Sequence, residues 1–244
     1  MQKDPNIFCA GFEGPNKVGK SYQMLMVGNL LSRNHIPYLK VKGEGTRPLS
    51  EVIPNDPTLT WWEERPQLTS RDRSKPRWEE ASYRLGQELV FFRDEILPNM
   101  IENHNGNPKF GVLLVDRTLL SRALIPIEGK VDNVYESLYP NSARIDGQII
   151  SPEDVCPDIT FNLHAPKDEL LRRLKLSDPR FKFRKELIEK KHDWYLKAVE
   201  QMPENLRSRF LPIDASGSKE EVYSSISSIL KKSLIRRFGV ALQD

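Results

Sequence analysis

The sequence has little of several features that mark particular protein classes. Its 244 residues include 2 cysteines, Cys9 and Cys156, which have neither the spacing of a metal site nor the density of a disulfide framework. Its 4 histidines are scattered, without a zinc pattern or a serine nucleophile motif, so neither a metalloenzyme nor a hydrolase triad is favoured. Internal repeats and low-complexity segments are also missing. This composition fits a reducing, cytoplasmic setting.

Charge and hydropathy narrow the choice of partners. The 37 Lys and Arg residues nearly balance the 34 Asp and Glu residues, and a net charge of +3 does not by itself favour nucleic acid. The chain has no apolar run long enough to span a membrane, and its first residues do not form a charged-then-apolar leader. We therefore expect a small-molecule ligand, and neither a membrane nor nucleic acid as a partner.

Apolar runs typical of strands alternate with segments of helical spacing, which favours βαβ units and a parallel sheet. The length suits one α/β domain over residues 1–244, with a loop-rich segment at about 43–77 and a lid at about 175–186. The five predicted strands are 7–11, 36–41, 111–115, 159–163 and 210–213.

Helices are predicted between these strands. Residues 22–33 and 78–104 have one apolar face, and Pro98 is expected to kink or end the second of these helices. A further helix starts after Pro166, a long one covers much of 187–202, and a capping box of Ser218 and Glu221 begins the last.

The most specific pattern is an octapeptide of the form G-x-x-x-x-G-K-[ST], placed between the first predicted strand and the first predicted helix. Glycines allow successive backbone N–H groups to point at phosphate oxygens, and the start of a helix also favours an anion. Lys20 adds a positive charge, and the hydroxyl of Ser21 suits Mg²⁺. The pattern predicts a P-loop NTPase fold that binds ATP and Mg²⁺, with these residues contacting the cofactor: Gly14, Asn16, Lys17, Val18, Gly19, Lys20 and Ser21.

Two further groups of residues suit phosphoryl transfer. Asp116 and Arg117 follow a buried strand, at the sheet edge where ligands bind in open α/β folds, and are expected to hold Mg²⁺ and phosphates respectively. Arg180 and Arg184 follow an Asp-Pro break in a basic run, where a flexible lid would bring them over the transferring phosphate. The other basic residues of that run are expected to be solvated.

The residues that could bind the phosphate acceptor form less specific sequence patterns. Glu44 and Arg47 lie in a glycine-containing segment after the second strand, which is either an acceptor site or a simple turn. Phe92 belongs to an aromatic pair that either walls a base pocket or fills the core.

The chain resembles the thymidylate kinase family of P-loop nucleoside monophosphate kinases from about Asn6 to Leu230. The resemblance rests on five segments in order: Phe12-Glu13-Gly14-Pro15-Asn16-Lys17-Val18-Gly19-Lys20-Ser21; Gly45-Thr46-Arg47-Pro48-Leu49-Ser50-Glu51; Ile96-Leu97-Pro98; Asp116-Arg117 with Ser121; and 157–163 with Arg180-Phe181 and Ile213-Asp214-Ala215.

This resemblance implies transfer of the γ-phosphate of Mg²⁺–ATP to a nucleoside monophosphate, on a five-stranded parallel sheet and commonly in a homodimer. It implies that Lys20 and Ser21 hold donor phosphates and metal. Asp116 and Arg117 would orient metal and phosphates, and Arg180 would belong to the lid.

The chain departs from the family on the acceptor side. Asn16 replaces an aspartate that approaches the acceptor sugar, and the Y-Q-G segment is absent around residues 125–127. The thymine-reading arginine aligns with Glu88, with Arg84 and Arg93 offset from it. Together with Phe92 they remain candidates for acceptor binding. The acceptor is thus dTMP or another nucleotide; the alternatives are a deoxynucleoside kinase, in which Glu44 would be the base, and a nucleotide-binding module without transfer.

Overall fold

The structure is a computed structural model that describes residues 6–42, 92–104, 108–118, 143–145, 148–150, 156–177 and 204–243. It also describes single positions between them, which are 185, 188, 189, 192, 195, 199, 200 and 202. The predicted loop-rich segment and most of the predicted lid lie outside these residues.

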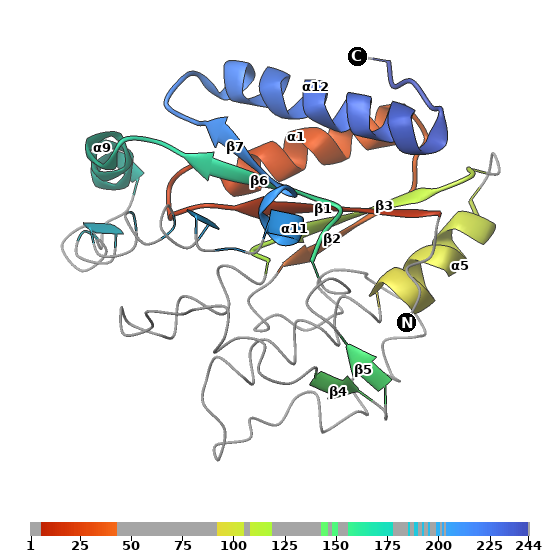
Figure 1. Cartoon of the computed structure of the whole chain (residues 1–244). Helices are drawn as coiled ribbons and strands as arrows, with labels where there is room; N and C mark the ends of the chain where they lie inside the picture. The colour runs from red at the N-terminus through yellow and green to blue at the C-terminus, as the bar shows by residue number, and fades with distance from the viewer. Residues whose placement is uncertain are drawn as a thin grey trace.

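Five parallel strands form the central sheet, as the sequence predicts (Figure 1). They lie in the order β2-β3-β1-β6-β7, so the first strand of the chain occupies the centre. Each strand ends on a polar or charged residue, which makes the carboxyl edge of the sheet polar. The strands are β1 (Ile7–Glu13), β2 (Tyr38–Lys42), β3 (Gly111–Asp116), β6 (Ile159–His164) and β7 (Phe210–Asp214).

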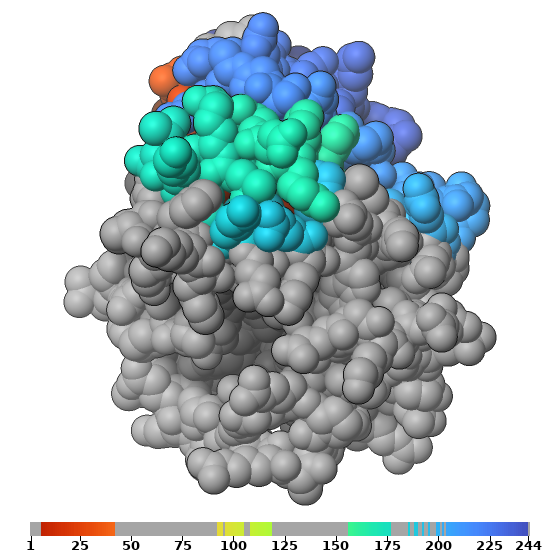
Figure 2. Space-filling view, turned by 90° about the vertical axis from the view of Figure 1, so that its left-hand side faces the viewer, coloured from red at the N-terminus to blue at the C-terminus, as the bar shows by residue number. Residues whose placement is uncertain are grey.

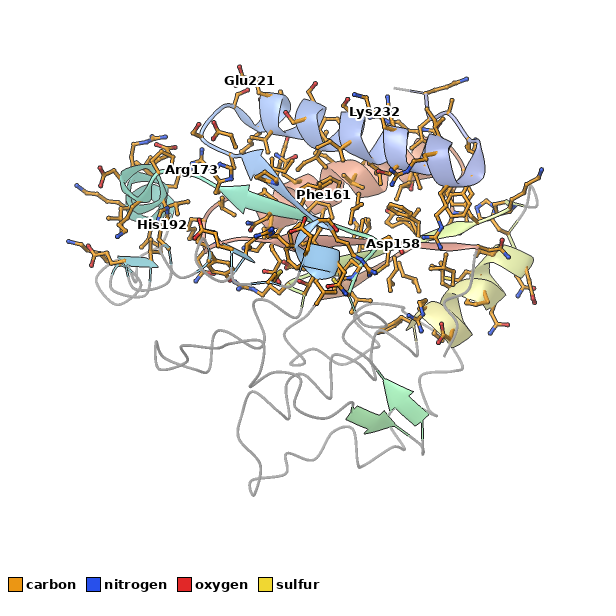
Figure 3. The ribbon with its side chains drawn as sticks, in the orientation of Figure 1. Asp158, Phe161, Arg173, His192, Glu221 and Lys232 are labelled. Carbon is orange, nitrogen blue, oxygen red and sulfur yellow. The ribbon has the colours of Figure 1, made fainter. Side chains whose placement is uncertain are left out.

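One face of the sheet is covered by α1 (Lys20–Arg33) and α12 (Lys219–Phe238), which lie side by side in Figure 1. Alternate strand residues point at these helices, and the rings of Phe12 and Phe161 pack with centroids 5.2 Å apart. Phe161 lies in the middle of this layer in Figure 3. The apolar stripes of the two helices and the alternating strand residues therefore meet in one core.

The opposite face is packed by α5 (Leu97–Glu102), whose Leu97 is buried close to Gly111. Pro98 does not end the predicted helix, because helical backbone continues through it to Glu102, and the kink stays a prediction. Pro98 stands in the first turn of α5, after a single π-helical turn, η2 (Phe92–Ile96). A proline is tolerated in a first turn because its missing N–H would have no partner within the helix there.

The second half of the chain supplies the remaining elements. α9 (Lys167–Ser177) follows Pro166 as predicted, with Leu170 and Leu174 fully buried. α11 (Glu204–Arg207) and the antiparallel pair β4 (Ala143–Ile145) and β5 (Gln148–Ile150) were not anticipated. Helical backbone recurs at described positions between 185 and 200, which agrees with the long helix predicted there.

The capping box at the start of α12 is confirmed. Ser218 Oγ accepts a hydrogen bond from the backbone N–H of Glu221 at 3.2 Å, and Ser218 N–H donates to Glu221 Oε2 at 2.7 Å. The bond from the Ser218 backbone lowers the pKa of the Glu221 carboxyl. At the other end of α12 the chain turns back, Leu242 is buried, and the Asn34 side chain bonds Gln243 N–H and C=O. Within the described parts of the chain, no helix is both long and apolar enough to cross a membrane.

Candidate functional site

The candidate site lies where the direction of the chain connections reverses. After β1 the chain runs through α1 to β2, which lies beyond β3 on one side of β1. After β3 the chain continues to β6, which lies on the other side of β1. In open parallel sheets such a reversal opens a crevice at the carboxyl ends of the two central strands. The segment 14–19 follows β1, and residues 117 and 118 follow β3, which ends at Asp116. The topology thus brings together the two strongest predicted motifs, on the side of the sheet that Figure 2 faces.

The loop after β1 contains three residues with positive φ. Gly14, Lys17 and Gly19 have φ values of 130°, 68° and 105°. α1 starts directly afterwards, and Tyr22 N–H and Gln23 N–H both donate to the carbonyl of Gly19. The first turn of α1 contains no acidic side chain, so its positive end is not offset there by a carboxylate. A strand, a loop and a helix N-terminus in this order are typical of sites at which backbone N–H groups bind a phosphate.

Lys20 folds back across this loop. Its Nζ donates to the carbonyl of Gly14 at 2.7 Å and to the carbonyl of Pro15 at 2.9 Å, and the residue is only 7% exposed. A lysine ammonium is thereby held against the loop that the sequence predicts to bind phosphates. Of the other predicted loop residues, Val18 is buried, Asn16 and Lys17 are half-buried, and Ser21 is exposed on the first turn of α1.

Asp116 ends β3 with a carboxylate that is incompletely satisfied. The residue is 7% exposed, and among the described residues its Oδ1 atom is buried without a hydrogen-bond partner. A buried carboxylate oxygen left in this state is costly, and a bound cation is one of the arrangements that explains it.

A cation at Asp116 would not be held by protein side chains alone. Within the described ranges, no group of three or more His, Cys, Asp or Glu side chains is placed to hold a metal ion. Mg²⁺ prefers oxygen ligands, keeps several waters, and is commonly bound through one or two side chains together with substrate phosphates. Asp116 and Ser21 are the described residues that would supply those side-chain oxygens.

Arg117 is fixed in an unusual backbone conformation beside the loop. Its φ is 66°, in the left-handed region, and its N–H donates to the carbonyl of Phe12 at 3.0 Å. One guanidinium nitrogen donates to Asn16 Oδ1 at 2.6 Å. Two predicted site residues from distant parts of the sequence are therefore in direct contact.

Sequence reasoning missed two buried partners at the same place. The hydroxyl of Thr118 donates to Glu13 Oε1 at 2.7 Å, and both residues are 0% exposed. Glu13 and Thr118 each adjoin a predicted motif, yet neither was assigned a role. The available signal was a charged residue at the end of an otherwise apolar strand.

The adjoining loop after β7 is tied to α9. Arg173 donates to the carbonyl of Ala215 at 2.8 Å and to Glu169 Oε1 at 2.7 Å, and Figure 3 places it beside the end of the sheet. Hydrogen bonds from Arg172 and Arg173 lower the pKa of the Glu169 carboxyl to about 2. Arg172 is exposed, as expected for the basic run, whereas Arg173 is half-buried and joins two elements.

The remaining predicted residues divide into two groups. Phe92 and Arg93 lie in η2 and are buried, and the Arg93 guanidinium bonds both carboxylate oxygens of Asp94 at 2.6 and 2.9 Å. Their contact with an acceptor stays a prediction. The others lie outside the described residues, and these are Glu44, Arg47, Arg84, Arg180 and Arg184.

Comparison with known proteins adds no family assignment. The sequence matches no protein-family model and no curated protein. The geometry of the site and the motif resemblance are therefore what point to a function.

Gly14→Ala is expected to destabilise the protein and to disrupt the loop. A Cβ atom at Gly14 would lie 2.2 Å from the carbonyl oxygen of Leu163, in a backbone conformation that only glycine adopts easily. The strain and the clash together should lower the free energy of unfolding by about 2–4 kcal/mol in urea denaturation.

Gly239→Ala is the matched control, because Gly239 also has positive φ but has open space around its Cβ position. Its loss should be about 1 kcal/mol. Equal losses in the two variants would contradict the tight packing of the loop against β6.

Proposed function

We propose that this protein is a P-loop phosphotransferase that moves the γ-phosphate of Mg²⁺–ATP to a nucleoside monophosphate, as thymidylate kinases do. The observation that carries the proposal is the loop after β1. Three residues with positive φ lead into α1, and Lys20 folds back onto the loop carbonyls. The incompletely satisfied Asp116, at the end of the neighbouring strand, adds the carboxylate that a magnesium-dependent transfer requires.

Phosphoryl transfer requires the protein to position the two substrates and to stabilise negative charge. When bound, Mg²⁺ would neutralise charge on the phosphates and hold them in one orientation. Loop N–H groups and Lys20 would hold the donor phosphates, with Ser21 and Asp116 as the side chains nearest the metal. As the acceptor oxygen attacks, negative charge spreads over the transferring group, and the guanidinium of Arg117 would stabilise it. Arg180 and Arg184 would complete this from the lid.

The contact between Asn16 and Arg117 supports a negatively charged acceptor. An amide oxygen at 2.6 Å orients the guanidinium but does not neutralise it, whereas an aspartate at position 16 would. An amide partner at position 16 is therefore compatible with a guanidinium that binds a phosphate group. Together with the motif resemblance, this contact leads us to infer that a monophosphate, rather than an uncharged nucleoside, receives the γ-phosphate.

A panel of acceptors tests this proposal directly. Purified protein with Mg²⁺–ATP is offered ribo- and deoxynucleoside monophosphates and the corresponding nucleosides, and the products are separated by ion-exchange chromatography. The proposal predicts diphosphates from at least one monophosphate, and no product without Mg²⁺. Phosphorylation of nucleosides alone would identify a deoxynucleoside kinase. Binding of ATP without transfer to any acceptor would identify a nucleotide-binding module.

A further inference from the structure

The bond between Glu13 and Thr118 joins the two strand ends that carry the candidate site. Glu13 is the last residue of β1, directly before the loop, and Thr118 is the second residue after β3. The hydroxyl–carboxylate distance is 2.7 Å and both side chains are fully buried. A hydrogen bond to an ionised or polar group removed from water in this way is among the stronger ones in proteins.

The local backbone is arranged around this bond. A left-handed conformation at Arg117, with φ of 66°, turns the chain so that Thr118 lies back over β1. Its methyl group lies 2.4 Å from where a Cβ atom at Gly11 would stand, so position 11 accommodates Thr118 only as glycine. A left-handed non-glycine residue persists where surrounding contacts hold it, and such residues cluster at functional sites.

We propose that Glu13 and Thr118 are positioning residues that lock the turn at Arg117. This inference rests on the proposed function, in which Asp116 and Arg117 act on the metal and the phosphates. The Thr118 hydroxyl holds the turn from one side, while the Arg117 N–H bond to Phe12 holds it from the other. Together these bonds fix where the Asp116 carboxylate and the Arg117 guanidinium stand relative to the loop.

The consequence is an effect on turnover rather than on nucleotide binding. Lys20 Nζ and the first N–H groups of α1 bond the carbonyls of Gly14, Pro15 and Gly19, and Thr118 takes no part in these bonds. Release of the Arg117 turn would misplace Asp116 and Arg117 and loosen the Asn16 contact, while the bonds of Lys20 to the loop carbonyls would remain. Misplacement of reacting groups by about 1 Å costs on the order of 10²-fold in rate.

Thr118→Val and Thr118→Ser separate this role from a purely structural one. Valine keeps the shape and removes the hydroxyl, whereas serine keeps the hydroxyl. In Thr118→Val, kcat should fall about 10- to 100-fold with the acceptor found in the panel. The affinity for Mg²⁺–ATP, measured by isothermal titration, should change less than about threefold. Thr118→Ser should retain most of the turnover.

A second measurement tests the positioning role without depending on phosphoryl transfer. Hydrogen exchange of the Arg117 amide, measured by NMR, should accelerate about tenfold in Thr118→Val and little in Thr118→Ser. Ser227→Ala is the control, because it removes another largely buried hydroxyl, on α12, that bonds Ser224 C=O. That variant should change neither kcat nor the Arg117 exchange rate.

The outcomes separate the two proposals. Wild-type protein that transfers phosphate to no acceptor refutes the proposed function, and the exchange rate then decides whether the turn is locked. Unchanged exchange of the Arg117 amide in Thr118→Val overturns the positioning role. So does equal loss of turnover in the valine and serine variants, or a loss of ATP affinity as large as the loss of kcat.

Discussion

Replacement of Lys20 by alanine is expected to lower the rate of ATP-dependent transfer by on the order of 10³-fold. The ammonium that lies against the Gly14 and Pro15 carbonyls would be lost, and with it a full positive charge beside the donor phosphates. The fold should survive, because the side chain contributes polar contacts within one loop rather than packing in the core. Steady-state kinetics and a thermal melt on the same preparation measure both effects.

Lys232→Ala is the matched control for this variant. Lys232 is an exposed lysine on α12, and Figure 3 shows it on the outer side of that helix. The Lys232→Ala substitution removes the same charge from the protein without changing the loop, and the turnover of this variant should equal that of the wild type. Near-normal turnover in Lys20→Ala would refute the assignment of the loop as the donor site.

Asp116→Asn is expected to lower kcat by on the order of 10²-fold and to raise the Mg²⁺ concentration needed for half-maximal rate. The amide keeps the shape of the side chain but is a poorer ligand for a hard cation. Without nucleotide, the melting temperature should not fall, because the substitution replaces a buried carboxylate oxygen that has no partner among the described residues. Activity would be lost while stability is kept or gained, as is common at functional sites.

Asp158→Asn is the control for Asp116→Asn, because the opposite effects on stability and on Mg²⁺ dependence are expected from it. Asp158 Oδ2 accepts from the Cys9 N–H at 2.8 Å and pairs with Arg237 at 2.9 Å, just before β6. Its loss should lower the melting temperature and leave the Mg²⁺ dependence unchanged. If both variants shifted melting and Mg²⁺ dependence alike, Asp116 would not be the metal ligand.

The three central strands β3, β1 and β6 were the most predictable because they are buried on both faces, which produces continuous apolar runs. The predicted ends nevertheless fell one or two residues short. The strands continue to Glu13, Lys42, Asp116, His164 and Asp214 because pairing of the backbone, and not the polarity of the side chain, determines where a strand ends. Those extra residues are the ones that form the polar edge.

The site was predictable only in its local parts. The loop pattern and the Asp116-Arg117 pair are each recognisable within a few residues. The contacts of Arg117 with Asn16 and of Thr118 with Glu13 depend on the register of β1 against β3 and on a left-handed turn. A non-glycine residue gives no sequence sign of that conformation, because it is imposed by surrounding contacts.

The central position of β1 also affects how the chain can fold. β1 is made before both of its neighbours, because Ile7 pairs with Gly111 and Ala10 with Ile159, both far along the sequence. During synthesis at about 5–20 residues per second, β1 would wait about 5–30 s for its neighbours, with both strand edges unpaired until then. Contacts of such separation slow folding and expose the nascent chain to aggregation. Until those contacts form, the strand that leads into the loop at residues 14–19 needs protection by a chaperone or by the ribosome.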